Sequence, residues 1–328
     1  MYSIYCPFRY GAIKLNKMRN IVIACTTAFI LLTVALETAA QGWTQPKGQF
    51  FLKLDFSFIH ARDFYGPDAN IYSINGSGTR LGSYTTALYG EYGLSKKLTL
   101  IAYTPFLVRN TVNEGIGAIT GEVLQPGLEN TAFGDVDLGV RYGLLKKGKF
   151  VLSTSLMLGI PSGDFKNPDL LYTGDGEFNQ LLRVEWGYGA ARWYTNGAVG
   201  FNKRSKGFSD ESRLNAEFGY WLLKSRLLSS AKIVVAQSFF NGDPGGSSNG
   251  LFANNVEYIS PQLALTWEHK GKWGLSALFA GAFGGHERAG SACCFLRGIL
   301  EAGGGGEKGL SGIAILRGGG GFWMFFVF

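Results

Sequence analysis

The first candidates for catalysis are two of the chain's three histidines, His60 and His269. A catalytic histidine needs a nucleophile, or a carboxylate that activates water, within hydrogen-bond reach. Near His60 the sequence offers Ser57, Asp63 and Asp68. Loop histidines are mostly solvated, and His269 falls in an expected tight turn. We therefore predict no catalytic residue and no enzymatic activity.

Two loops combine glycine with acidic residues, at 174–177 and 241–243. Their oxygen atoms could bind calcium, or cations that bridge lipopolysaccharide. The same residue types are the ordinary material of loop tips, so we predict no metal site. The glycine-rich stretch 242–250 has no Gly-Lys-Ser/Thr and opens no helix, which excludes a phosphate-binding loop. We predict no cofactor.

Charged residues also alternate with apolar ones along segments of about ten residues. In 133–144, Asp137 and Arg141 alternate with Leu138 and Val140. Such alternation places the two sets on opposite faces of a strand. Charged residues that share one face are our candidates for lining an interior. These lumen-lining candidates are Lys53, Asp55, Glu91, Asp135, Asp137, Arg141, Arg183, Glu185, Arg213, Glu217 and Glu257. They could pair and nearly fill a narrow lumen, or line a path for small solutes.

The alternating pattern recurs in eleven segments of about ten residues each. The segments are 49–59, 83–93, 97–109, 133–144, 149–159, 178–189, 192–202, 211–221, 228–238, 257–267 and 272–283. Short connections alternate with long ones rich in Gly, Asn, Asp and Ser. Short turns at one end and long loops at the other are typical of transmembrane barrels. We predict an all-β fold: an antiparallel up-and-down transmembrane β-barrel of about 12 strands.

Aromatic residues near the segment ends suggest belts at the two membrane surfaces. They are Tyr84, Tyr92, Tyr142, Trp186, Tyr188, Trp193, Tyr220, Trp221, Trp267 and Trp273. A periplasmic sandwich or lipocalin-like barrel would expose the same apolar face to water, which disfavours this soluble alternative.

Residues 1–40 have the layout of a signal peptide. Lys14 and Arg19 lie in a basic region before the apolar run 21–36, and small residues precede an expected cleavage site after Ala40. Export of a barrel predicts the bacterial outer membrane as its location. Its expected partners are outer-membrane lipid and lipopolysaccharide, with the barrel-assembly machinery acting during insertion.

The overall charge of +7 overstates how basic the folded part is. Eight of the 31 Lys and Arg residues and four of the 24 Asp and Glu residues lie outside 41–285, which leaves that part at +3. A balance this small predicts no nucleic-acid partner. The four cysteines also lie outside 41–285, so this part can form neither a disulfide framework nor a thiolate metal site.

Several stretches resemble the outer-membrane transporters named for the phenol meta-degradation pathway, a family distantly similar to long-chain fatty-acid channels. The resemblance covers about 43–285. The stretches are WTQPKGQFFLKL at 43–54, YTTALYGEYGLSKKLTL at 84–100, FGDVDLGVRYGLL at 133–145, TGDGEFNQLLRVEWG at 173–187, GFNKRSKGFSDE at 200–211 and NNVEYISPQLAL at 254–265. The resemblance implies an outer-membrane barrel that passes small molecules, apolar or aromatic ones among them. The alternatives are a closed-lumen structural or surface-adhesion barrel and, third, an outer-membrane hydrolase.

The tail 286–328 does not continue the pattern. It has 12 glycines in 43 residues and holds Cys293 and Cys294, and its last stretch, FWMFFVF, is apolar on both faces. Eleven segments precede it, whereas single-chain bacterial barrels have an even number of strands. Two interpretations stay open: a frameshift near Gly285 that replaced the last strand, or a genuine last strand at 321–328. The expected domains are thus 1–40 signal peptide, 41–285 barrel and 286–328 atypical tail.

Overall fold

The computed structural model describes residues 42–61, 63–65, 71–73, 80–117, 119–223, 226–243, 254–269, 273–283 and 288–290. The predicted signal peptide and residues 291–328 lie outside this part of the chain. Among the described residues, no helix is long and apolar enough to cross a membrane.

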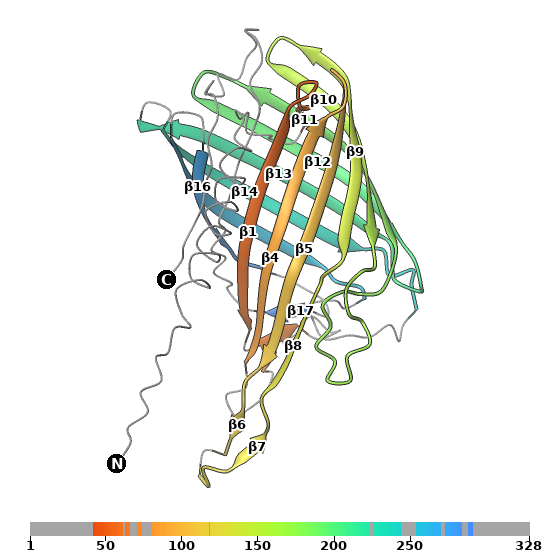
Figure 1. Ribbon diagram of the computed structural model, residues 1–328, viewed down its shortest axis with the longest axis vertical. Helices are drawn as coiled ribbons and strands as arrows, with labels where there is room; N and C mark the ends of the chain where they lie inside the picture. The colour runs from red at the N-terminus through yellow and green to blue at the C-terminus, as the bar shows by residue number, and fades with distance from the viewer. Residues whose placement is uncertain are drawn as a thin grey trace, which may run out of the picture.

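A single antiparallel sheet of twelve strands curves around an interior (Figure 1). Eleven long strands follow one another in chain order, each paired with the next. They are β1 (Phe50–Ala61), β4 (Leu81–Gly93), β5 (Leu98–Val112), β9 (Val136–Lys147), β10 (Phe150–Ile160), β11 (Asn179–Gly189), β12 (Trp193–Arg204), β13 (Glu211–Leu222), β14 (Leu227–Ser238), β15 (Tyr258–His269) and β16 (Trp273–Ala280). The short β8 (Leu128–Ala132) pairs with the end of β5. The all-β, up-and-down prediction is confirmed, and each expected segment matches one long strand.

Short turns close one end of the barrel, and longer connections extend from the other. We call these the short-turn end and the long-loop end. At the short-turn end, the connections are 94–97, 148–149 and 190–192. At the long-loop end, residues 161–178 join β10 to β11.

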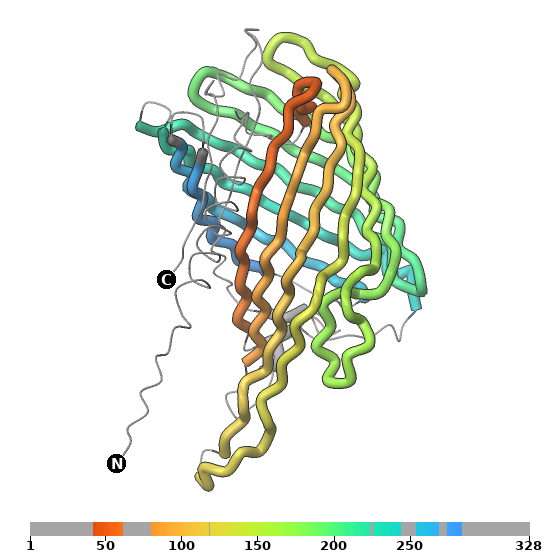
Figure 2. Tube along the Cα trace, in the orientation of Figure 1, coloured from red at the N-terminus to blue at the C-terminus, as the bar shows by residue number. Residues whose placement is uncertain are grey.

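The connection 110–132, expected to be a loop, is largely a β-ribbon. Strand β5 continues to Val112, β8 pairs with it, and β6 (Gly115–Ile116) and β7 (Val123–Gln125) prolong the ribbon beyond the barrel (Figure 2). The β-branched residues Val108, Thr111 and Thr131 favour this extension, because they fit a pleated strand. A separate small sheet joins β2 (Asp63–Tyr65), β3 (Ile71–Ser73) and β17 (Arg288–Gly290).

The main sheet ends at β1 and β16. In the described part of the chain, β1 pairs with β4 and β16 pairs with β15, and no described strand joins their other edges. Pairing is regular to Ala280, and a single bridge between Ile259 and Phe283 follows. The expected twelfth long strand belongs to residues that the structure does not describe, so the two interpretations of the tail stay predictions.

The two faces of the sheet differ as the alternation predicted. On β9, Leu138 is 44% exposed on the outside, whereas Arg141 is 2% exposed inside. The outer face also carries aromatic rings near the short-turn end. Trp193 lies 5.4 Å from the ring of Tyr188 and 6.0 Å from that of Phe218. Large apolar side chains therefore cover the outside, and charges gather within.

Trp221 does not lie in the expected outer belt of aromatic residues. It is 5% exposed and packs with Tyr194 and Leu228 inside the barrel. Its neighbour Tyr220 lies on the outer face, and consecutive strand residues point to opposite faces. Tyr220 and Trp221 therefore cannot both belong to an outer belt.

The two faces can be compared at neighbouring residues of β15. Leu263 points outward in the middle of the strand, and Ala264 lines the interior. We expect Leu263→Lys to destabilise the folded barrel in bilayers, with a loss of about 2–4 kcal/mol in the free energy of unfolding, because it places a charge in hydrocarbon. Ala264→Lys should cost much less. Urea titrations in lipid vesicles measure both, and equal losses would contradict the assignment of the faces.

Candidate functional site: the barrel lumen

The lumen holds a cavity of about 630 Å³ lined by inward side chains of the long strands. Seven of the eleven predicted lumen residues line it. They are Lys53, Asp55, Asp137, Arg141, Arg183, Arg213 and Glu217. Apolar side chains lie between them. These include Phe51, Ile101, Tyr103, Met157, Leu181 and Val234. The wall is thus mixed, with ion pairs interleaved among apolar and aromatic groups.

Arg141 forms the most deeply buried ion pairs of the described lumen. Its Nε lies 2.7 Å from Oε2 of Glu185, and its Nη1 lies 2.9 Å from Oε1 of Glu91. Both carboxylates are buried. Ser155 donates a hydrogen bond of 2.6 Å to Glu185, and Arg183 lies 3.1 Å from the same carboxylate. Buried charges of this kind persist only when they are paired and hydrogen-bonded.

The strand register brings these residues together. Arg141 of β9 lies opposite Ser155 of β10, which lies opposite Arg183 of β11. Glu185 is one inward position further along β11. Glu91 reaches Arg141 from β4, on the other side of β5. Four separate strands therefore meet at one depth near the short-turn end.

Residues 42–49, which we call the N-terminal segment, cross the lumen at this depth. The backbone N–H of Gln45 donates to Oγ1 of Thr99 at 2.8 Å, and its side chain donates to Glu91 at 3.0 Å. Arg141 donates to the carbonyl oxygen of Trp43 at 3.2 Å. The Trp43 ring lies against Gly187 of β11, where a Cβ atom would overlap the ring. The segment thus runs from β1 to β11 across the short-turn end.

Residues 161–178, which we call the mouth loop, fold inward at the long-loop end. Leu171 is 3% exposed and packs against Ala61 of β1 and Leu81 of β4. Asn130 of β8 donates to the Leu171 carbonyl oxygen at 2.7 Å, and Asn110 of β5 donates to that of Tyr172. These partners lie on the inner face, so the loop reaches across the mouth from β10 towards β1.

Asp135, a predicted lumen residue, orders the two limbs of the mouth loop. Its carboxylate accepts the N–H of Gly163 at 2.8 Å and that of Asp175 at 2.9 Å. Gly174 lies so close to this carboxylate that a side chain there would overlap it. The glycine and acidic residues at 174–177 therefore shape the loop. The described residues contain no group of three or more His, Cys, Asp or Glu side chains that could hold a metal ion.

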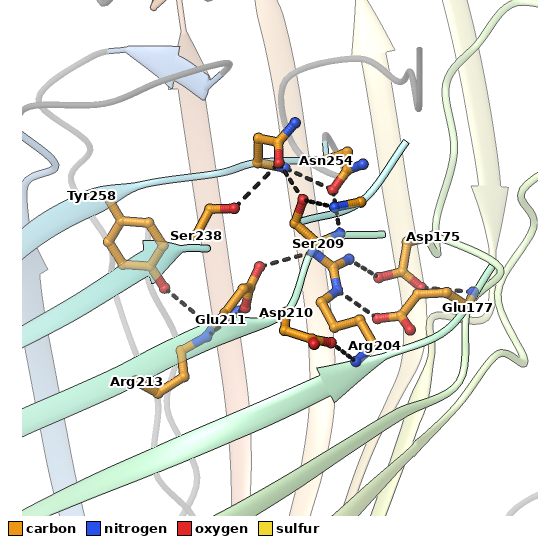
Figure 3. Close-up of polar contacts among 12 residues, drawn as sticks. Asp175, Glu177, Arg204, Ser209, Asp210, Glu211, Arg213, Ser238, Asn254 and Tyr258 are labelled. Carbon is orange, nitrogen blue, oxygen red and sulfur yellow. Dashed lines mark hydrogen bonds and ion pairs between the residues drawn. The ribbon is translucent and has the colours of Figure 1, made fainter. Parts of the chain in front are cut away.

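An arginine cluster fastens the other side of the mouth loop (Figure 3). Arg204, at the end of β12, lies 3.1 Å from Asp175, 2.7 Å from Glu177 and 2.8 Å from Glu211. Arg213 of β13 shares Glu211, with its Nε at 2.8 Å. Arg213 also donates to the hydroxyl of Tyr258 at 3.1 Å. We call these residues the Arg204 cluster. Burial, followed by the carboxylate of Glu177, raises the pKa of Asp175 to about 7.

The remaining predicted residues differ in their surroundings. Lys53 lies 2.8 Å from Asp55, and Lys232 lies 4.0 Å from Glu217. Glu257 precedes β15 and is not part of the cavity lining, because the inward positions of β15 have even numbers, such as Gln262 and Ala264.

His60 and Ser57 lie on opposite faces of β1, and the side chains of Asp63 and Asp68 lie outside the described residues. The Nε2 of His60 is 2.8 Å from the hydroxyl of Tyr84 on the outer face, whereas Ser57 has the inward parity of β1. The side chain of His269 lies outside the described residues. The geometry therefore assembles no Ser-His pair from the candidates that the structure describes.

Several residues of the lumen were missed by sequence reasoning. Arg204 follows the expected end of its segment at 202, although it shares the inward parity of that strand. Lys232 belongs to 228–238, where the alternation is blurred. Nothing in the periodicity indicates that Trp43 and Gln45 reach across the barrel, because they belong to no strand.

Comparison with known proteins shows the fold. No family model and no curated protein matches the chain. A solved outer-membrane channel from Pseudomonas putida F1 superimposes with a TM-score of 0.60 at 14% identity, over 81% of this chain and 98% of that one. The chain thus has the barrel fold of an outer-membrane channel. The finer resemblance to transporters of the phenol meta-degradation pathway stays a prediction.

Two other solved barrels match more loosely. A monoaromatic hydrocarbon channel has a TM-score of 0.36 at 8% identity, over 78% of this chain and 88% of its own. A Pseudomonas aeruginosa FadL homologue has a TM-score of 0.34 at 9% identity, over 78% of this chain and 87% of its own.

The buried pairs of Arg141 can be tested by removing the cation. Arg141→Met leaves Glu91 and Glu185 without their main partner, so we expect a loss of about 3–5 kcal/mol in the free energy of unfolding. Arg109→Met is the matched control, because Arg109 pairs with Glu129 at an exposed site of the same barrel. It should shift the urea midpoint little. Equal shifts for the two variants would contradict the role given to burial.

Proposed function

We propose that this protein is a bacterial outer-membrane barrel that passes small molecules through its lumen. The observation that carries the proposal is the cavity of about 630 Å³ inside a barrel whose outer face is apolar. A volume of this size is in the range of small-molecule sites in proteins. The apolar outer face supports a location in lipid, where outer-membrane lipid and lipopolysaccharide would surround the barrel.

The lining supports small solutes with an apolar or aromatic body. Met157, Leu181 and Ile101 offer apolar contact, and Tyr103 offers a ring with a hydroxyl group. Most of the charges beside them are already engaged in ion pairs within the wall. A solute therefore meets a surface with apolar stretches and partly compensated charges, rather than a wall of one sign.

A closed-lumen structural or surface-adhesion barrel is the second candidate. It is favoured by the N-terminal segment and the mouth loop, which cross the lumen at its two ends. If both stayed in place permanently, the cavity would be an enclosed space and the exposed ribbon of β6 and β7 would be the functional surface. Measurement of solute flux separates the two candidates.

Adjacent serines of β14 offer a direct test of passage. Ser230 lines the cavity, and Ser229 has the opposite parity. Ser230→Trp should narrow the lumen and slow the swelling of proteoliposomes in small amphipathic solutes severalfold. Ser229→Trp should leave the rate unchanged, because aromatic residues are well placed at the outer face near a membrane surface. No swelling above empty liposomes in the parent protein would favour the closed-lumen candidate, and equal slowing by both variants would contradict a luminal path.

A further inference from the structure

The mouth loop is held on two sides that differ in chemistry. Near β1 it is held by apolar packing of Leu171 and by amide side chains that donate to its backbone. Near β12 and β13 the ion pairs that hold it, among those of the described chain, are those of the Arg204 cluster, and Lys206 adds a hydrogen bond to the carbonyl oxygen of Gly176. Apolar packing does not respond to protons. The Arg204 cluster can respond to protons, because its contacts between the loop and the barrel involve carboxylates.

The Arg204 cluster has more carboxylates than cations. Two guanidinium groups, Arg204 and Arg213, face Asp175, Glu177 and Glu211. A fourth carboxylate, that of Asp135, accepts the backbone N–H of Asp175. Asp137, at the start of β9, adds another inward carboxylate on that side. The excess charge is therefore negative on the strands that pack against Asp175.

The neighbouring lysines do not correct this excess by pairing with the cluster. Lys203 lies 2.9 Å from Asp210, with its side chain largely exposed. Lys206 donates to the backbone carbonyl oxygen of Gly176. The remaining titratable partner is the hydroxyl of Tyr258, which accepts from Arg213. An uncompensated carboxylate in a buried cluster is costly, and uptake of one proton relieves that cost.

Asp175 is the group placed to exchange this proton. Its side chain is 16% exposed, whereas those of Glu177 and Glu211 are almost fully buried. It is also the loop residue that lies against both Asp135 and Arg204. Its pKa, raised by burial and then by Glu177, agrees with this position.

We propose that the Arg204 cluster is a proton-operated latch on the mouth loop: with one shared proton it holds the loop across the lumen, and when that proton leaves the loop is released. The latch regulates the solute path of the proposed function, on which its biological use rests. Acidic conditions therefore close the mouth, and neutral or alkaline conditions open it.

The direction follows from the two states of Asp175. With the loop released, the carboxyl group has an ordinary pKa near 3.8, whereas in the latched loop its pKa is about 7. The latched state binds more protons between these values, so the latch is strongest at the acidic end and weakens as pH rises from about 4 to about 7. The ratio of released to latched loop should rise by up to about tenfold per pH unit in this window. Above it the ratio should level off.

Labelling of a buried loop residue measures the latch without any need for transport. The reporter is Thr173→Cys, two residues from Asp175 and 1% exposed, in a background whose four native cysteines are replaced by serine, reacted with a maleimide in proteoliposomes. Its rate is divided by that of Ile119→Cys, which is 99% exposed in the ribbon of β6 and β7. This division removes the pH dependence of the thiol itself. We expect the relative rate to rise at least tenfold between pH 5 and pH 7.5.

Two neutralised aspartates provide the matched comparison. Asp175→Asn mimics the protonated carboxyl group and cannot become charged. Its relative labelling rate should therefore stay, at every pH, at the slow value that the parent shows in acid. Asp169→Asn removes an exposed carboxylate of the same loop and should follow the parent curve. A parent rate that does not change with pH, or an Asp175→Asn rate that changes as the parent does, would overturn the latch. Because the readout is labelling, its result is independent of whether liposome swelling supports or refutes solute passage.

Discussion

The buried guanidinium of Arg141, held between Glu91 and Glu185, is the contact on which the interior of this barrel depends. A charge at this position is tolerated because two carboxylates pair with it, and a backbone carbonyl accepts a further hydrogen bond. The requirement constrains more than one residue. Strands β4, β9 and β11 must present their inward positions at the same depth, and a shift of one residue in any of them would turn its charge to the apolar outer face of the sheet. The ion pairs thereby help to fix the register of the sheet.

The same contact bounds one end of the lumen cavity. The N-terminal segment lies across the lumen because Gln45 and the Trp43 carbonyl oxygen bind members of the Arg141 network. At the other end the mouth loop lies across the lumen through contacts of a similar kind, centred on Arg204. The cavity between them is therefore bounded by two pieces of chain that are attached by hydrogen bonds and ion pairs. Such attachments can be exchanged with water, whereas the strand ladder cannot open without leaving backbone N–H and C=O groups unpaired.

Much of the fold could be predicted from the sequence, because strand alternation is a local signal. The outward Leu138 and the inward Arg141 follow directly from their parity on one strand, and seven predicted residues line the cavity. The pairing of side chains could not be predicted from the sequence. Arg141 and Glu91, for example, are fifty residues apart and meet only through the register of the intervening strands. The N-terminal segment and the mouth loop carry no periodicity. Trp221 lies inside because the parity of its strand outweighs the preference of aromatic residues for the outer ends of strands. The tail after Gly290 lies beyond the described residues.

If solutes pass through the lumen, the N-terminal segment should limit their passage, because it crosses the lumen at the short-turn end. Single-channel conductance of a chain that lacks residues 42–46 tests this claim most directly, because the deletion removes Trp43 and Gln45 but leaves Arg141 paired with Glu91 and Glu185. We expect a larger unitary conductance than that of the full chain under the same salt and voltage. An unchanged conductance, in a deleted chain that shows the same heat stability as the parent, would contradict it.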